Sequence, residues 1–329
     1  MKIFIYPLLF CSVLFFSCNS STEKRNTVYL PESVGAINGL QIVISNDLWN
    51  NQVGERIREY FAAPTDGLPR QEPLFSINQI QPENYTDFAR TYRTFLHITL
   101  ADVDSVKIKK NSFAKPQIGA FITGTNEEKL LELLDSAHQS IIQTFKAYEI
   151  KERQRRTNIS LLKVDSLTER FGISMKIPSA YRVASACNDF YWIRKDLKSS
   201  GSTNILIYEV PLSVIGRDTT IIGDIVRMRD TIGSGYLPVE DDALFVTEEA
   251  YAPYLFTTEI DHKFAYETKG TWEVKGAYMA GPFVNYAIRD EAHQRYLIIE
   301  GFTYAPSMEQ RDLQFELESI IKSTKFEGG

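Results

Sequence analysis

The chain begins with an apolar run from Ile3 to Phe16, preceded by a single positive charge at Lys2. A charged start followed by a short apolar run is typical of a secretory signal peptide. A membrane-spanning helix needs about 20 apolar residues, and hydrophilic sequence already begins at Asn19. The sequence therefore predicts that residues 1–17 are removed and that folding concerns only the remainder. A short uncleaved amino-terminal anchor is the alternative.

The residues before Cys18 read Leu14-Phe15-Phe16-Ser17, with a small residue directly before the cysteine. This pattern resembles the lipobox of bacterial lipoproteins. The resemblance implies that Cys18 carries a thioether diacylglycerol and an amide-linked acyl chain, so it is the expected lipidation site. Two or more acyl chains hold a protein stably on a bilayer. We therefore expect residues 18–35 to form a lipidated cysteine and a flexible tether.

The location of the anchored protein follows from the same resemblance. Residues 19–24 lack the acidic run that resembles a surface-export signal. We expect an outer-membrane lipoprotein that faces the periplasm, with the cell surface as the alternative.

The cysteine content bounds the covalent chemistry. Of the three cysteines, Cys11 leaves with the signal and Cys18 is consumed by lipid, which leaves Cys187 alone. An intramolecular disulfide or a cysteine metal cluster is thereby excluded. Cys187 lies in an apolar, strand-like context, so we expect a buried small hydrophobe rather than a nucleophile.

The charge and composition exclude further classes. The formal charge of −6 becomes −7 once Lys2 is lost, which gives no electrostatic reason to bind nucleic acid. With 43% hydrophobic and 12% aromatic residues, the chain can build real cores. We expect no cofactor. The expected partners are the membrane, through the lipid, and a protein or glycan of the envelope.

Strand-like and helix-like pieces alternate along the first half from Leu40. Thr125–Lys151 is the clearest helix, because apolar residues recur in it every three or four positions. The predicted strands are residues 41–44, 74–80, 95–100, and a hairpin of 106–110 with 118–123; the other predicted helices start at Ser45 or Asn46, ending before Pro64, and span 83–92.

The second half is richer in strands. Strands are predicted at residues 173–177, 181–186, 190–194, 204–210, 255–261, 270–274, 283–288 and 296–302, helices at 161–171, 219–230 and 307–323, and an irregular loop at 233–242. The expected fold class is α+β with two sheet-and-helix halves, the second a strand-rich sheet closed by a carboxy-terminal helix. The expected domains are an amino-terminal α/β domain over residues 36–156 and a carboxy-terminal α+β domain over 157–329.

Several phrases of the sequence together resemble an uncharacterised family of lipoproteins from Bacteroidetes-type bacteria, classed as a domain of unknown function. The resemblance covers nearly all of the mature chain but carries no activity or catalytic residues. The phrases are Leu30-Pro31-Glu32-Ser33, Asn46-Asp47-Leu48-Trp49, Phe171-Gly172-Ile173-Ser174, Lys176-Ile177-Pro178, Tyr191-Trp192-Ile193-Arg194-Lys195, Asn204-Ile205-Leu206-Ile207-Tyr208, Arg229-Asp230, Gly270-Thr271-Trp272-Glu273-Val274-Lys275-Gly276, Gly281-Pro282-Phe283 and Glu300-Gly301-Phe302-Thr303-Tyr304-Ala305-Pro306.

Motifs for catalysis are weak. The histidines are scattered, which makes a metal site improbable: His97, His138, His262 and His293. Residues 290–293 are interpreted as a turn between strands, and Gly233-Ser234-Gly235 as a flexible loop. The remaining acid/base candidates are Glu259 and Asp261, beside His262, because two carboxylates at i and i+2 on a strand share a face.

Aromatic and cationic residues of the second half form the candidate ligand surface, since such residues bury area with little loss of entropy. The set is Tyr181, Arg182, Tyr191, Trp192, Arg194, Trp272 and Tyr278. The alternative is that the aromatics are core and the arginines solvated. A basic cluster ends the long helix, for which a solvated helix terminus is favoured over a contact with lipid or an acidic partner: Lys151, Arg153, Arg155 and Arg156.

The sequence alone therefore favours a non-enzymatic binding or envelope-assembly module. An envelope hydrolase acting on glycan or peptide is the alternative.

Overall fold

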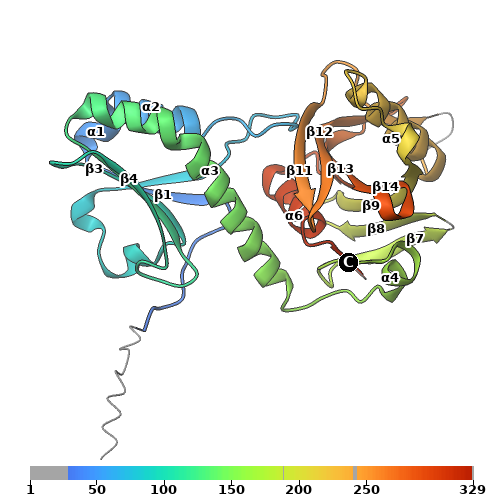
Figure 1. Cartoon of the computed structure of the whole chain (residues 1–329), viewed down its shortest axis with the longest axis horizontal. Helices are drawn as coiled ribbons and strands as arrows, with labels where there is room; N and C mark the ends of the chain where they lie inside the picture. Colours follow the sequence, from blue (N-terminus) through green and yellow to red (C-terminus); the bar gives the residue numbers. More distant parts are fainter. Residues whose placement is uncertain (1–28, 188, 240–242, 328–329) are drawn as a thin grey trace, which may run out of the picture.

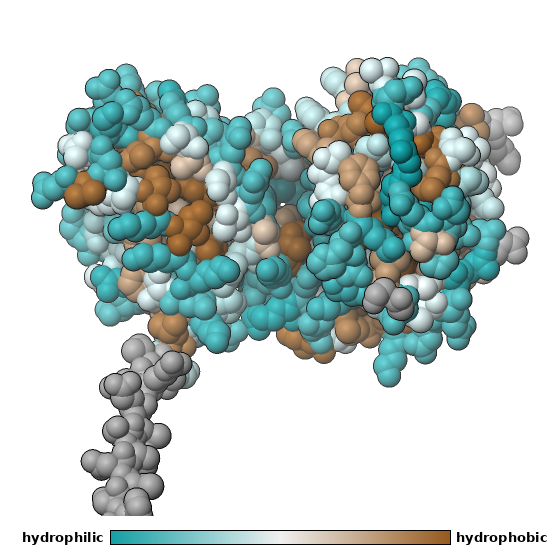
Figure 2. Space-filling model, in the orientation of Figure 1, coloured by the Kyte–Doolittle hydropathy of each residue, from teal (hydrophilic) through white to brown (hydrophobic). Residues whose placement is uncertain are grey.

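The computed structural model describes residues 29–187, 189–239 and 243–327. The predicted signal peptide and the lipidation site Cys18 lie outside these residues. The described chain forms two sheets, each with its own helices, side by side (Figure 1), and the space-filling view shows the two halves next to each other (Figure 2). The mixed α+β class with a sheet-and-helix first half and a strand-rich second half is confirmed. Among the described helices, none has the length and apolarity to cross a membrane.

The first half holds a five-stranded sheet in the order β2-β1-β3-β5-β4. β1, β2, β3 and β5 are parallel neighbours, and β4 pairs antiparallel with β5 as the predicted hairpin requires. The strands are β1 (Gly39–Val43), β2 (Ser76–Ile80), β3 (Thr94–Leu100), β4 (Ser105–Lys110) and β5 (Ile118–Gly124).

One face of this sheet is covered by α2 (Gln52–Phe61) and α3 (Glu127–Thr157). A short helix, α1 (Asn46–Asn50), precedes α2, and the Ser45 hydroxyl caps it by accepting from the backbone N–H of Leu48. The single helix expected here is divided because Asn51 is extended. The Asn126 side chain caps α3 in the same way, accepting from Lys129.

The other face of the sheet is covered by residues 82–91. The helix predicted at 83–92 is wrong: the segment forms two short 3₁₀ turns, η1 (Pro82–Asn84) and η2 (Asp87–Thr91). Between them Tyr85 is buried, with its ring 5.7 Å from that of Phe95 on β3. Tyr85 and Phe95 belong to a small apolar cluster on this face of the sheet. The segment forms two short turns, not one helix, where Tyr85 packs into this cluster.

The second half holds an eight-stranded sheet in the order β10-β12-β13-β14-β9-β8-β7, with β11 also paired to β12. All its pairings are antiparallel. The strands are β7 (Arg182–Cys187), β8 (Phe190–Asp196), β9 (Ser202–Pro211), β10 (Leu244–Thr247), β11 (Tyr254–Ile260), β12 (Lys263–Lys275), β13 (Ala280–Asp290) and β14 (Arg295–Tyr304), and β6 (Ile173–Ser174) pairs separately with β15 (Lys325–Phe326).

Helices cover both faces of this sheet. α4 (Asp165–Phe171) and the closing helix α6 (Arg311–Ile321) pack on one face, and α5 (Ile221–Tyr236) on the other. The irregular loop predicted at residues 233–242 is wrong at its start, because α5 continues through residues 233–236. Gly233 lets the helix approach Phe245, whose ring lies only 2.5 Å from where a Cβ would stand.

Cys187 is exposed, so the expectation of a buried hydrophobe is wrong. It ends β7, which among the described strands pairs only with β8 and thus forms an edge of the sheet. An edge position leaves its side chain without the second layer that a central strand would have.

Candidate functional site

The two halves meet where α3 runs past α6 (Figure 1). The amino-terminal part of α3 packs on the first sheet, while its later turns reach the second half. Gln154 of α3 donates to the backbone carbonyl of Ser319 at 2.9 Å, and Asn38 donates to the Asp312 carboxylate at 2.9 Å. The helix α3 therefore packs in the core of the first half and also contacts α6 of the second half.

An ion pair on each side reinforces this junction. Glu149 of α3 and Arg93 are fully buried and joined at 2.7 Å. Glu316 of α6, itself buried, pairs with Arg153 of α3 and with Lys195 of β8. Buried charges persist only when they are paired and hydrogen-bonded, so these contacts hold α3 in one position.

A loop of the first half, residues 62–75, crosses to the second half and is called the bridging loop (Figure 1). Its Glu72 carboxylate accepts from the backbone N–H groups of Gln310 and Arg311 at 2.7 and 2.8 Å. These N–H groups begin α6, where the helix dipole favours an anion. Gly67, at φ +77°, lies against β12: a Cβ there would be 2.8 Å from the Cβ of Lys269.

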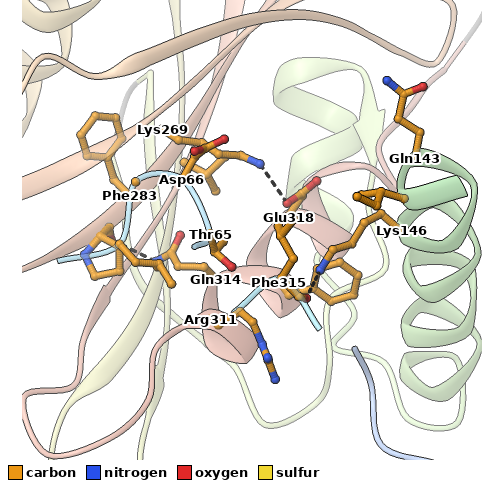
Figure 3. A pocket seen from close by; sticks show the side chains of 16 residues that line it. Thr65, Asp66, Gln143, Lys146, Lys269, Phe283, Arg311, Gln314, Phe315 and Glu318 are labelled. Carbon is orange, nitrogen blue, oxygen red and sulfur yellow. Dashed lines mark hydrogen bonds and ion pairs between the residues drawn. The ribbon is translucent and has the colours of Figure 1, made fainter. Parts of the chain in front are cut away.

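The bridging loop, α3, α6 and β12–β13 enclose a cavity of about 230 Å³, here called the junction pocket (Figure 3). Its walls are largely apolar, with a few charged groups among them. The lining residues are Thr65, Asp66, Gly67, Leu68, Leu74, Ile142, Gln143, Lys146, Lys269, Pro282, Phe283, Val284, Arg311, Gln314, Phe315 and Glu318.

Lys146 is the cation that α3 contributes to the pocket. Its Nζ donates to Asn38 Oδ1 at 2.9 Å and to the Leu74 carbonyl at 2.7 Å, and it lies 4.4 Å from the ring centre of Phe75. Burial lowers the pKa of Lys146 to about 7. Glu318 acts in the opposite direction, but the neighbouring cations Arg311 and Lys269 offset its attraction. An ammonium has three donors, so one remains beyond the two hydrogen bonds.

Lys269 enters from β12 on the opposite side and points toward Glu318 of α6 (Figure 3). Nζ of Lys269 lies 2.8 Å from Glu267 and 3.4 Å from Glu318, and Lys322 also donates to Glu318 at 2.6 Å. Although burial acts in the opposite direction, these carboxylates raise the pKa of Lys269, and the lysines lower that of Glu318. Both groups are therefore held in their charged forms.

The hydroxyl Oγ1 of Thr65 lies where the bridging loop lines the pocket. It is buried and has no hydrogen-bond partner in the described part of the chain. A buried hydroxyl without a partner costs free energy. A ligand oxygen in the pocket would satisfy it.

The predicted ligand surface is only partly a surface. Tyr181, Tyr191 and Trp272 are buried at 2%, 7% and 1% exposure, so these three belong to the cores, as the alternative held. Tyr181 donates instead to Glu316 at 2.8 Å, inside the junction. The alternation of a sheet covered on both faces places aromatic residues inward on either side.

The remaining members lie apart. Trp192 and Arg194 line a cavity of about 90 Å³ together with Trp272. Arg182 forms an exposed ion pair with Asp196, and Tyr278 is fully exposed.

The candidate acid/base pair is not assembled. Glu259 is exposed on β11, whereas Asp261 lies in the two-residue turn between β11 and β12 with a positive φ. The Asp261 carboxylate accepts from Lys325 at 2.6 Å and from the Phe326 N–H at 2.8 Å, which lowers its pKa rather than raising it. Asp261 therefore ties the carboxy-terminal strand to the turn.

The other motifs have structural roles. Residues 290–293 form the turn between β13 and β14, as predicted, while Gly233-Ser234-Gly235 is helical. The basic cluster is not simply a solvated end, because Arg153 pairs with Glu316 and Arg156 donates to the Gly35 carbonyl. Within residues 29–187, 189–239 and 243–327, no group of three His, Cys, Asp or Glu is placed to hold a metal ion.

Sequence reasoning missed the junction pocket. Its residues come from positions near 65, 146, 269 and 315, and no spacing in the sequence links them. The one available signal of the pocket in the sequence is the position of Lys146. This lysine directly follows Phe145, and Phe145 lies on the apolar face of a long amphipathic helix.

Comparison with known families finds two matches. Residues 33–158 match the family model "Domain of unknown function (DUF8532)", and residues 160–323 match "Domain of unknown function (DUF4837)". No curated protein matches the chain. A crystal structure from Bacteroides thetaiotaomicron VPI-5482 at 1.50 Å resolution is 12% identical, with a TM-score of 0.26, and the match covers 47% of this chain and 45% of that one. The chain thus spans less than half the length of that protein.

Proposed function

We propose that this chain, in which two domains of unknown function stand in tandem, is an exported, lipid-anchored binding protein of the cell envelope. Its anchor is Cys18, and it lies on the periplasmic side of the outer membrane. Its ligand is a small molecule with an apolar body and a carboxylate, held in the junction pocket. The observation that carries the proposal is Lys146, a half-buried ammonium at the edge of an apolar cavity, with one donor beyond its two hydrogen bonds.

The apolar body follows from the pocket walls. Leu74 and Ile142 come from the first half, Phe283 and Val284 from the second, and Phe315 from α6. Ligand sites are typically lined by apolar side chains with a few placed polar groups. Because both halves contribute, a bound ligand would contact the two at once.

The carboxylate follows from the charges. Lys146, Lys269 and Arg311 line the pocket, against Glu318 and the exposed Asp66. Glu318 is already bonded to two lysines, and Arg311 to Asp312 and the bridging loop. The third donor of Lys146 and the Thr65 hydroxyl are then the groups that would receive a ligand anion.

The same geometry favours binding over the hydrolase alternative. A carboxylate that acts as general base needs a pKa raised toward the working pH, and Lys146, the other candidate, already donates to Asn38 and to the Leu74 carbonyl. Glu318 is held as a carboxylate by Lys269 and Lys322, which lowers its pKa away from that range. Its role is electrostatic, keeping neighbouring cations in place.

The test is hexanoate binding by calorimetry, with the full chain in phosphatidylcholine nanodiscs. Lys146→Met keeps the length of the side chain but removes the donor, and we expect at least tenfold weaker binding, about 1.4 kcal/mol. Binding to the native protein should weaken as pH rises from 6 to 9, because Lys146 loses its proton around pH 7. In Lys146→Met this dependence should be absent.

The matched control is Lys151→Met, an exposed lysine further along α3. It should bind hexanoate as the native protein does. Equal affinities for all three proteins, or no saturable binding at pH 6, would refute the proposal.

A further inference from the structure

A second hollow lies along the bridging loop and shares residues 65–68 with the junction pocket as its wall. Its volume is about 690 Å³, and we call it the outer groove. Its far side is formed by the segment before β11 and by Gly270 and Thr271 of β12. The groove is therefore built by both halves of the chain.

Exposed aromatic rings run along this groove. Tyr251 and Tyr254 line it with 71% and 51% exposure, and Phe256, two residues further on β11, is 41% exposed. Residues i and i+2 of a strand share a face. The rings of Tyr254 and Phe256 are parallel within 4°, with centres 6.4 Å apart. Water-exposed rings in such a row contrast with the buried tyrosines of the same half.

The groove contains both hydrogen-bond donors and hydrogen-bond acceptors. Arg70 and Gln71 of the bridging loop offer donors, and Asp66 and Glu248 offer carboxylate oxygens. Glu248 accepts from Thr271 at 2.7 Å, which fixes one of its oxygens. Arg70 is held by the Pro306 carbonyl at 3.2 Å.

These features distinguish between ligand classes. Two carboxylates against one arginine disfavour an anion such as the ligand of the junction pocket. The polar lining disfavours a purely apolar ligand. Sugar rings, by contrast, have apolar faces that pack on aromatic rings and hydroxyls that both donate and accept hydrogen bonds.

We propose that the outer groove, with Tyr251 and Tyr254 as its aromatic side, continued by Phe256 beyond its end, and Arg70 and Glu248 as its polar side, binds an uncharged oligosaccharide segment. This inference concerns a different site from the junction pocket. Its ligand is a glycan chain.

The experiment titrates the full chain in phosphatidylcholine nanodiscs with chitotetraose, followed by saturation-transfer NMR and calorimetry. Saturable binding is expected, with at least tenfold weaker affinity in Tyr254→Ala. Tyr254→Leu keeps an apolar side chain on the strand but lacks an aromatic ring face. The same loss of affinity for chitotetraose is expected, in a variant that disturbs the strand less than alanine does. Tyr278→Ala, a fully exposed tyrosine outside the groove, is the control and should bind normally.

The inference would be overturned by the absence of saturable chitotetraose binding, or by equal affinity in Tyr254→Leu and the native protein. Binding of tetra-alanine that displaces chitotetraose would also overturn it, in favour of a peptide along the β11 edge. Hexanoate should not displace chitotetraose from the native protein, so a failure at one site is separable from a failure at the other.

Discussion

Replacing Glu149 by alanine should lower the free energy of unfolding by about 3–5 kcal/mol, the range found when one partner of a buried ion pair is removed. Glu149 is fully buried. It accepts from Arg93 at 2.7 Å, from the Asn38 backbone N–H at 2.8 Å and from the Thr94 hydroxyl at 2.9 Å. The variant leaves the Arg93 guanidinium buried without its carboxylate.

Urea unfolding followed by circular dichroism measures this effect. Glu132→Ala is the control on the same helix, because its ion pair with Lys129 is exposed and contributes less than about 1 kcal/mol. If Glu149→Ala were no more destabilising than Glu132→Ala, Glu149 would not anchor α3.

Replacing Glu316 by alanine should uncouple the two halves. Glu316 is the shared partner of Arg153 on α3, Lys195 on β8 and the Tyr181 hydroxyl. Its loss leaves two cations facing one another across the junction, while each sheet keeps its own core. We expect the free energy of unfolding to fall by about 2–3 kcal/mol. This is less than for the fully buried Glu149–Arg93 pair, because Arg153 is 29% exposed.

The distinguishing result is the shape of the unfolding curve. Cooperative units separate when the contacts between them weaken, so one urea transition should become two. Glu309→Ala, an exposed residue just before α6, should leave the curve unchanged. A single transition at the native midpoint in Glu316→Ala would contradict a coupling role for this residue.

The sequence predicts what depends on local pattern. The apolar period of α3, the hairpin of β4 and β5 and the closing helix α6 are confirmed, because each buries one face against a neighbouring layer. The fold class follows from the same periodicity.

The local pattern of the sequence does not predict which single aromatic residues are buried, and it does not predict the candidate site. Tyr181 and Trp272 occur in stretches with nearby arginines, yet a sheet covered on both faces buries them, and periodicity does not tell which faces are covered. The pocket depends on the bridging loop. The position of this loop is fixed because its residue Glu72 accepts a hydrogen bond from the start of α6, more than 200 residues further along the chain. Local pattern carries no information on such a contact.

The proposed role of Lys146, a half-buried ammonium, is to receive the carboxylate of the ligand. An NMR titration of the lysine side chains in protein labelled with ¹³C at Cε, assigned with Lys146→Met, tests it directly. We expect a pKa of about 7 for Lys146 in the free protein and a rise of this pKa on saturation with hexanoate, because an anion favours the charged form. A pKa near the ordinary value of about 10.4 in the free protein, or one that hexanoate does not move, would contradict it.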